Sequence, residues 1–126
     1  PRAIVAAMLP PGVEIALGMI RDPQFGPVVT VGAGGVLIEL LRDRRAALAP
    51  FGVATATRLL DRLAIRRLLD GHRGAAPVDI GGLALAASRF SVLAHDLADI
   101  VGEIDVNPLV CGRDIAAVDA LVVPRP

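Results

Sequence analysis

The chain has 126 residues, of which 54% are hydrophobic, so it can bury a core and has the usual size of one domain. Its formal net charge is zero at pH 7, which gives no support to nucleic acid or a charged membrane as the partner. The basic residues are Arg and His without any Lys, which excludes a Schiff-base or phosphate-binding Lys within these residues.

The first third of the chain has the pattern of β-strands. Residues 2–9 form a short apolar run that a Pro-Pro-Gly sequence ends, and residues 13–31 predict a hairpin with Gly and Pro at its tip. After a glycine cluster, residues 36–41 resume an extended apolar segment. We therefore expect antiparallel strands within residues 2–41.

The middle of the chain predicts two helices. Apolar residues recur at helical spacing over residues 55–70, Arg residues form a polar stripe beside them, and Gly71 has the position of a C′ residue. Asp79 is the expected N-cap of a second amphipathic helix over residues 80–100. His95 lies on this second helix, where a surface or partly packed position is more common than a catalytic one.

The last quarter of the chain returns to strands. Residues 103–107 alternate Glu, Asp and Asn with Ile and Val, and after a Cys-Gly-Arg-Asp turn an apolar run follows, which predicts a hairpin over 103–121. Strands, two helices and further strands make an α+β fold, an antiparallel sheet with two helices packed on one face.

Three oxygen-bearing side chains share one face of this last predicted strand. Since successive side chains of a strand point to opposite faces, Glu103, Asp105 and Asn107 lie together, and Asp119 comes from the neighbouring strand. Carboxylate and amide oxygens grouped in this way suit Mg²⁺. The same alternation is also typical of the solvated face of an ordinary half-buried strand, and periodicity alone leaves both interpretations open.

A series of short motifs runs through nearly the whole chain in one order. Together they resemble the C-terminal part of the ATP-grasp domain of NDP-forming (ADP-forming) acyl-CoA synthetases, and the β subunit of succinyl-CoA synthetase. The motifs are Gly12-Val-Glu-Ile-Ala-Leu-Gly18, Arg21-Asp-Pro-Gln-Phe-Gly-Pro27, Gly32-Ala-Gly-Gly35 with Glu39, Arg42-Asp43, Leu48-Ala-Pro50, Gly71-His-Arg-Gly74, Glu103-Ile-Asp-Val-Asn-Pro-Leu109 and Ala117-Val-Asp-Ala120.

The resemblance implies a role for four of these residues. Asn107 and Asp119 match Mg²⁺ ligands of the family, and Asp105 matches a carboxylate that helps to hold a phosphohistidine loop when it reaches the nucleotide. Glu14 matches a nucleotide-contacting Glu at the ribose. The implied cofactors are Mg²⁺ and ATP or ADP. The implied activity is that of an acid–CoA ligase working through phosphohistidine.

The glycine cluster has two interpretations. Gly34 and Gly35, with Gly32 before them, can let the backbone approach a phosphate, or they can form a bend between two strands. The sequence does not separate these interpretations.

Two positions depart from the family pattern. Ala6 stands where the family has a Glu or Gln beside the adenine, and Leu121 stands where Arg often follows the second metal ligand. Both changes fit a second hypothesis, in which the domain serves as a regulatory or oligomerising unit without turnover, as in fusions with acetyltransferase modules. Neither change affects Asn107 or Asp119.

Only half of an ATP-grasp site is expected in residues 1–126. The family's N-terminal half carries the Lys and the glycine-rich loop over the phosphates, and its acyl-CoA chemistry needs CoA-binding and phosphohistidine domains as further partners. The absence of an initial Met is typical of a domain taken from a longer protein. A single Cys and no apolar run long enough for a membrane span predict a cytoplasmic protein, with a homo-oligomer formed through its exposed face.

Overall fold

The computed structural model describes all 126 residues and contains one six-stranded antiparallel sheet. The strand order is β3-β2-β1-β4-β5, and β6 pairs with the other end of β4. The strands are β1 (Val13–Asp22), β2 (Gly26–Ala33), β3 (Arg44–Leu48), β4 (Val101–Cys111), β5 (Ile115–Ala117) and β6 (Ala120–Pro124). The helices are α1 (Leu37–Leu41), α2 (Val53–Asp61), α3 (Arg66–Leu69) and α4 (Ile80–Asp96).

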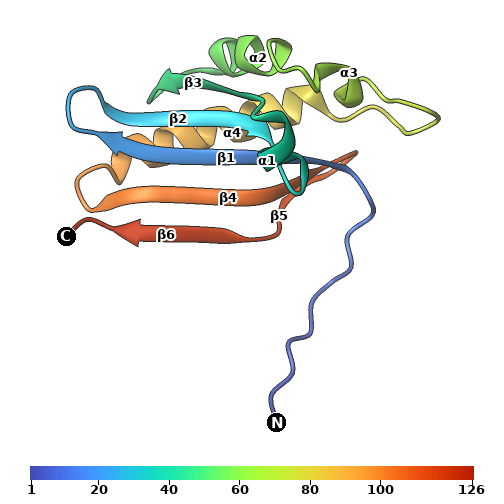
Figure 1. Cartoon of the computed structure of the whole chain (residues 1–126), viewed down its shortest axis with the longest axis horizontal. Coiled ribbons are helices and arrows are strands. Elements are labelled where there is room, and N and C mark those ends of the chain that lie inside the picture. Colours follow the sequence, from blue (N-terminus) through green and yellow to red (C-terminus); the bar gives the residue numbers. More distant parts are fainter.

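The two longer helices cover one face of the sheet, as the sequence predicts. Helix α4 packs against β1 and β2, and α2 packs against α4, β2 and β3. Figure 1 shows α4 behind the sheet and the short helix α1 in front of it, so the face opposite α4 carries only α1. No helix is long and apolar enough to cross a bilayer.

The core lies between the sheet and the helices and is almost entirely aliphatic. Alternation along the strands directs the apolar side chains of β1, β2 and β4 to the helices, where they lose their contact with water. The largest side chains that are fully buried belong to Ile15, Met19, Val29, Val31, Leu60, Leu69, Leu83, Ser91 and Cys111. The other face of the same strands is therefore free to carry polar groups.

Two predicted strands are wrong. Residues 2–9 form no strand, because both sides of β1 are already paired, to β2 and to β4, and the segment extends away from the domain (Figure 1). The predicted strand 36–41 is instead a turn at Val36 followed by helix α1, since Gly35 turns the chain with a φ of 59° and Ile38 N donates to Gly35 O. A short apolar run fits either element, and its periodicity does not separate them.

The predicted helix over 55–70 is interrupted by a buried carboxylate. Helix α2 ends at Asp61, and α3 begins only at Arg66. Between them, the backbone N–H groups of Ala64 and Ile65 donate to Asp43 Oδ1 and Oδ2, each at 2.9 Å. Asp43 thus ties the start of β3 to the helical layer.

Replacing Asp43 by Ala is expected to lower the free energy of unfolding by roughly 2–4 kcal/mol, because the buried N–H of Ile65 and the part-buried N–H of Ala64 lose a charged acceptor. Asp43 is only 7% exposed. Denaturation with urea, followed by circular dichroism, measures this change. The matched control is Asp22→Ala: Asp22 accepts from two amides in the exposed β1–β2 turn, and we expect a loss below about 1 kcal/mol. Equal losses at both positions would contradict the role given to Asp43.

The end of the chain confirms its predicted strands and adds one. Residues 103–107 lie within β4, and the apolar run that follows forms two short strands, β5 and β6, which pair with different parts of β4. The predicted helix over 80–100 is α4, which ends at Asp96. Asp79 caps it as predicted, since its Oδ1 accepts from Gly82 N at 2.9 Å.

Candidate functional site

The polar residues of β4 lie on the face of the sheet that α4 does not cover. Ile104 is 4% exposed and Val106 packs against the same core, whereas Glu103 is exposed and Asp105 and Asn107 are half-buried. The period of two that the sequence predicts therefore holds from 103 to 107, with the oxygen-bearing side chains on the helix-free face.

A β-bulge changes the direction of β4 directly after this run. Ile15 of β1 lies opposite Leu109, and Leu17 lies opposite Val106, so three steps along β4 correspond to two along β1. The extra residue falls within the Asn107-Pro108 segment. A bulge of this kind redirects a side chain and ends regular pairing, and it is common beside functional sites.

The glycine cluster, Glu14 and Asn107 meet at this bulge. Gly34 N donates to Glu14 O at 2.8 Å, and Gly35 N donates to Asn107 Oδ1 at 3.0 Å. Gly35 has a φ of 59°, and a Cβ added to it would lie only 1.6 Å from Glu14 Oε2, so the carboxylate of Glu14 rests directly on this glycine. Gly34 and Gly35 form a bend whose amides are used within the chain, and this bend holds Glu14 and Asn107 in place.

Asp119 lies beside Asn107 through the backbone. The N–H of Asn107 donates to Asp119 O at 3.2 Å, and Asp119 stands in the exposed segment between β5 and β6. Asp119 Oδ1 accepts from Ala120 N at 2.9 Å, and its other carboxylate oxygen makes no hydrogen bond within the chain. The structure thus brings Glu14, Gly34, Gly35, Asn107 and Asp119 to one end of the helix-free face.

The donor set at this end fits a cation that needs few protein ligands. No group of three or more His, Cys, Asp or Glu side chains lies close enough to hold a metal ion. Asn107 and Asp119 offer one amide oxygen and one carboxylate, which suits Mg²⁺, because this ion binds one or two protein carboxylates and completes its shell with water and phosphate oxygens.

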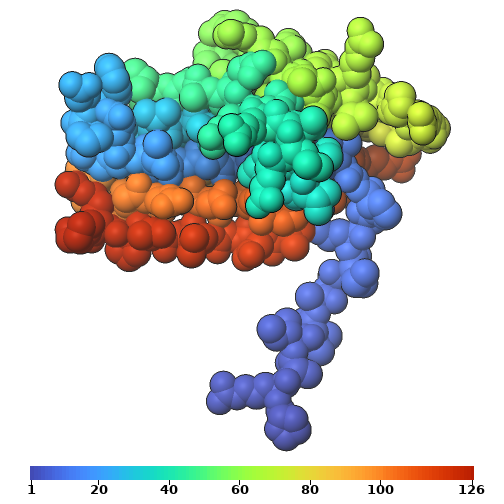
Figure 2. Space-filling view, viewed as in Figure 1, coloured from blue at the N-terminus to red at the C-terminus, as the bar shows by residue number.

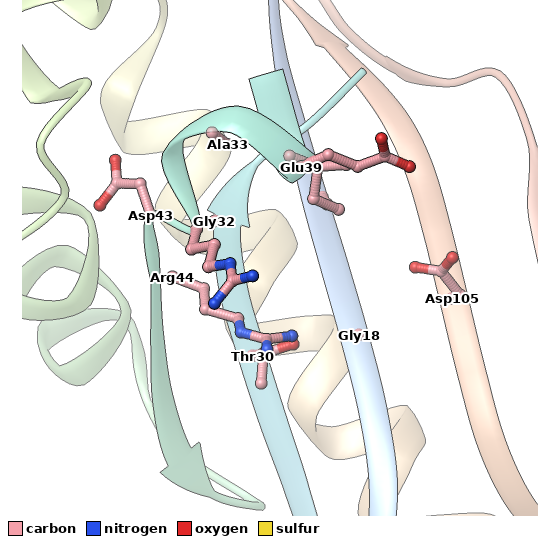
Figure 3. Close-up of a pocket in the computed structure, with 11 residues that line it drawn as sticks. Gly18, Thr30, Gly32, Ala33, Glu39, Asp43, Arg44 and Asp105 are labelled. Atoms are coloured by element: carbon pink, nitrogen blue, oxygen red, sulfur yellow. The ribbon is translucent and has the colours of Figure 1, made fainter. Parts of the chain in front are cut away.

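Asp105 lies farther along the same face, at a hollow of about 420 Å³. Figure 3 shows Asp105 and Glu39 on one side of this hollow, and Arg44 and Thr30 on the other. Arg42 also lines it. Sequence reasoning missed Thr30, Arg42 and Arg44 as site residues. The signal available was the cluster of basic residues that follows the apolar run 36–41.

The single cysteine lies outside this site. Cys111 is fully buried in the core, and its Sγ donates to Leu109 O at 3.4 Å. Burial raises the pKa of the Cys111 thiol to about 12, because the thiolate would lose its hydration.

The native Cys111 thiol is therefore expected to react with a maleimide at pH 8 at least a hundredfold more slowly than in the urea-unfolded chain, since thiolate is the reactive form. The free energy of unfolding also depends on pH through this thiol, because the pKa of Cys111 in the folded chain exceeds its unfolded value of 9.0. The stabilisation of the folded state by the protonated thiol is fully present below pH 9 and is lost as the pH rises toward about 12. Mass spectrometry of the modified chain measures the rates. Equal rates in the native and unfolded states would show that the thiol is accessible.

The profile of the ATP-grasp domain family matches residues 1–123, and the chain therefore belongs to the ATP-grasp domain family. It is 41% identical over 121 residues to the beta subunit of the ADP-forming acetate–CoA ligase I of Pyrococcus furiosus, a match that covers 95% of this chain and 52% of that protein. These findings confirm the family that the sequence motifs indicate.

Solved structures of a dinucleotide-forming acetyl-coenzyme A synthetase 1 from Ca. Korarchaeum cryptofilum have the same fold. One holds coenzyme A, acetyl-coenzyme A and a phosphorylated phosphohistidine segment, with a TM-score of 0.87, 38% identity, and coverage of 94% of this chain and 53% of that chain. Another holds coenzyme A and Mg-AMPPCP, with a TM-score of 0.84, 38% identity, and coverage of 93% and 55%. The chain thus spans about half the length of these relatives.

Proposed function

We propose that this chain is the nucleotide- and Mg²⁺-binding half of an ATP-grasp domain in an acyl-CoA synthetase that interconverts ATP with ADP and phosphate through a phosphohistidine. The observation that carries the proposal is the junction at the β4 bulge, where Gly35 N donates to Asn107 Oδ1 and Glu14 rests on Gly35. The relatives support it, because one is the beta subunit of an ADP-forming acetate–CoA ligase and another holds Mg-AMPPCP with its phosphohistidine segment pointing towards the nucleotide binding site.

Each residue of the junction has a distinct task in this proposal. Asn107 Oδ1 and the carboxylate of Asp119 hold Mg²⁺, which neutralises the phosphates and aligns them for in-line transfer when it is bound. The carboxylate of Glu14 accepts hydrogen bonds from the ribose hydroxyls. The bend at Gly34 and Gly35 fixes the spacing between Glu14 and Asn107.

The phosphoryl group moves between the nucleotide and the histidine. In the direction of ATP synthesis, the P–N bond of the phosphohistidine breaks and its electron pair stays on the ring nitrogen, while a P–O bond forms to the terminal phosphate of ADP. Asp105 faces the imidazole and keeps it oriented. The residues that complete the site, including a Lys over the phosphates and the CoA-binding and phosphohistidine domains, belong in our proposal to the rest of a longer, cytoplasmic protein.

Phosphorylation of the full-length protein tests this function. Incubation with Mg·ATP labelled at the γ-phosphate is expected to place acid-labile, base-stable label on histidine, and chelation of Mg²⁺ to prevent it. Addition of CoA and a carboxylic acid should discharge the label with formation of acyl-CoA. A protein that takes up no label, and forms no ATP from acyl-CoA, ADP and phosphate, would instead have the non-catalytic role of the second hypothesis.

A further inference from the structure

Two arginines, Arg42 and Arg44, line the hollow beside Asp105. Arg44 of β3 lies opposite Gly32 of β2 in the sheet register, and Arg42 ends helix α1. The next residue of β3, Arg45, points to the other face, where its Nη1 lies 3.9 Å from Asp43 Oδ1. Alternation along β3 therefore separates an arginine of the site from an arginine of the helical layer.

Neither of these two arginines has a partner within the chain. The ion pairs within 4.0 Å all involve Arg45 or Arg66. Arg42 and Arg44 also donate no side-chain hydrogen bond to another residue, although Glu39 and Asp105 line the same hollow (Figure 3). Both side chains are exposed, and an anion bound in the hollow would accept hydrogen bonds from their planar donors.

The backbone of Arg42 is left-handed, with a φ of 46°. Glycine is the usual residue in this conformation after a helix, because a side chain is strained there. Figure 2 shows the segment around α1 standing out over the strands. Arg42 thus holds a strained backbone conformation at the end of α1, and its side chain lines the hollow.

The floor of the hollow is bare backbone with one hydroxyl. A Cβ added to Gly18 would lie 2.7 Å from Thr30 Oγ1, and a Cβ added to Gly32 would lie 2.6 Å from Asp43 O, so neither position has room for a side chain. The Thr30 hydroxyl can donate a hydrogen bond into the hollow. The carboxylate of Asp43 points away from it in Figure 3 and accepts from the amides of the helical layer.

A hollow lined by two arginines and by the carboxylates of Glu39 and Asp105 fits a group with one anionic and one cationic end. A phosphorylated imidazole is such a group, because its phosphoryl oxygens are negative and its free ring nitrogen takes up a proton. The two histidines of this chain do not supply it: His95 is exposed on α4, on the other face, and His72 lies in the loop between α3 and α4.

We propose that Arg42 and Arg44, with the Thr30 hydroxyl, bind the phosphoryl oxygens of the group that passes between a histidine and the nucleotide. This inference rests on the proposed function and adds to it the residues that receive the transferred group. The arginines stay charged throughout and exchange no proton, so their effect is to stabilise the phosphoryl group at the hollow.

Three glutamine variants of the full-length protein test the proposal. For Arg42→Gln and Arg44→Gln, we expect at least a tenfold slower formation of phosphohistidine from Mg·ATP and at least tenfold weaker binding of orthophosphate by calorimetry. The affinity for Mg·ADP should stay within about twofold of the wild type, since ADP lacks the transferred group. Arg45→Gln is the matched control, because this neighbour faces the helical layer, and it should keep wild-type values. Arg44→Lys should recover part of the loss.

Separate outcomes would overturn the proposal. Phosphohistidine formation at the wild-type rate in both variants would show that the arginines take no part in the transfer. If orthophosphate binding fell at the same time, the hollow would be a binding site for free phosphate. An equal loss of Mg·ADP affinity would place them at the other phosphates. Arg42→Gly controls for folding, since glycine adopts a φ of 46° without strain and should not lower the melting temperature.

Failure of this inference can be told apart from failure of the proposed function. If the wild-type protein phosphorylates its histidine and the arginine variants do so equally well, the inference alone is wrong. If the wild-type protein forms no phosphohistidine, the proposed function fails, and the transfer role of the arginines fails with it.

Discussion

Replacing Asn107 or Asp119 by Ala in the full-length protein is expected to reduce Mg²⁺-dependent phosphoryl transfer by roughly a hundredfold or more. Each change removes one of the few protein oxygens that bind Mg²⁺ in our proposal, and this cation accepts few other kinds of ligand. Steady-state formation of ATP from acyl-CoA, ADP and phosphate, measured over a range of Mg²⁺ concentrations, gives the effect. The dependence on Mg²⁺ should shift to higher concentration in both variants.

A loss of activity in Asn107→Ala could come from the lost Mg²⁺ ligand or from the lost hydrogen bond to Gly35, because Asn107 Oδ1 also accepts from Gly35 N. Asn107→Asp keeps that acceptor and should retain more Mg²⁺ binding than Asn107→Ala. For Asp119, the matched control is Asp114→Ala, since Asp114 is exposed in the turn before β5 and makes no side-chain hydrogen bond. Wild-type turnover with wild-type Mg²⁺ dependence in both Ala variants would show that these residues bind no Mg²⁺ and only form the solvated face of an ordinary strand.

The local part of this site could be predicted from the sequence. The shared face of Asp105 and Asn107 depends only on the period of two along a strand, which the five residues 103–107 already show. The cap of α4 at Asp79 is equally local, since the side chain bonds an amide three residues ahead. Features of this kind need no knowledge of what the rest of the chain does.

The remaining part depends on contacts between distant residues. Gly35 and Asn107 are 72 positions apart, and only the bulge in β4 brings the amide of one to the side chain of the other. The helix is interrupted at Ala64 because the N–H of this residue donates to the Asp43 carboxylate instead of to a helical carbonyl, which the periodic pattern of the sequence cannot show. Arg44 becomes a site residue only when β3 pairs with β2, because that pairing decides which face its side chain occupies.

Replacing Asp105 by Ala is expected to leave the affinity for Mg·ADP and Mg·ATP nearly intact, while phosphohistidine forms and decays at least tenfold more slowly. The reason is its position: Asp105 lines the hollow with Arg42 and Arg44, whereas the proposed Mg²⁺ ligands lie at the bulge. A carboxylate that orients an imidazole lowers the barrier for transfer without contributing to nucleotide binding. Calorimetry gives the affinities, and rapid-quench measurement of labelled protein gives the rates.

Two further variants decide whether the charge of Asp105 or only its place on the strand matters. Asp105→Asn keeps the volume and should lose most of the transfer rate, because a neutral amide stabilises an imidazolium less than a carboxylate does. Glu103→Ala is the matched control: Glu103 is exposed on the same face two residues earlier, opposite Ile20 and Val123, and does not line the hollow. It should transfer phosphate at the wild-type rate. If Asp105→Ala weakened nucleotide binding as much as it slowed transfer, Asp105 would belong to the nucleotide and metal site, and the separation of the helix-free face into two subsites would be wrong.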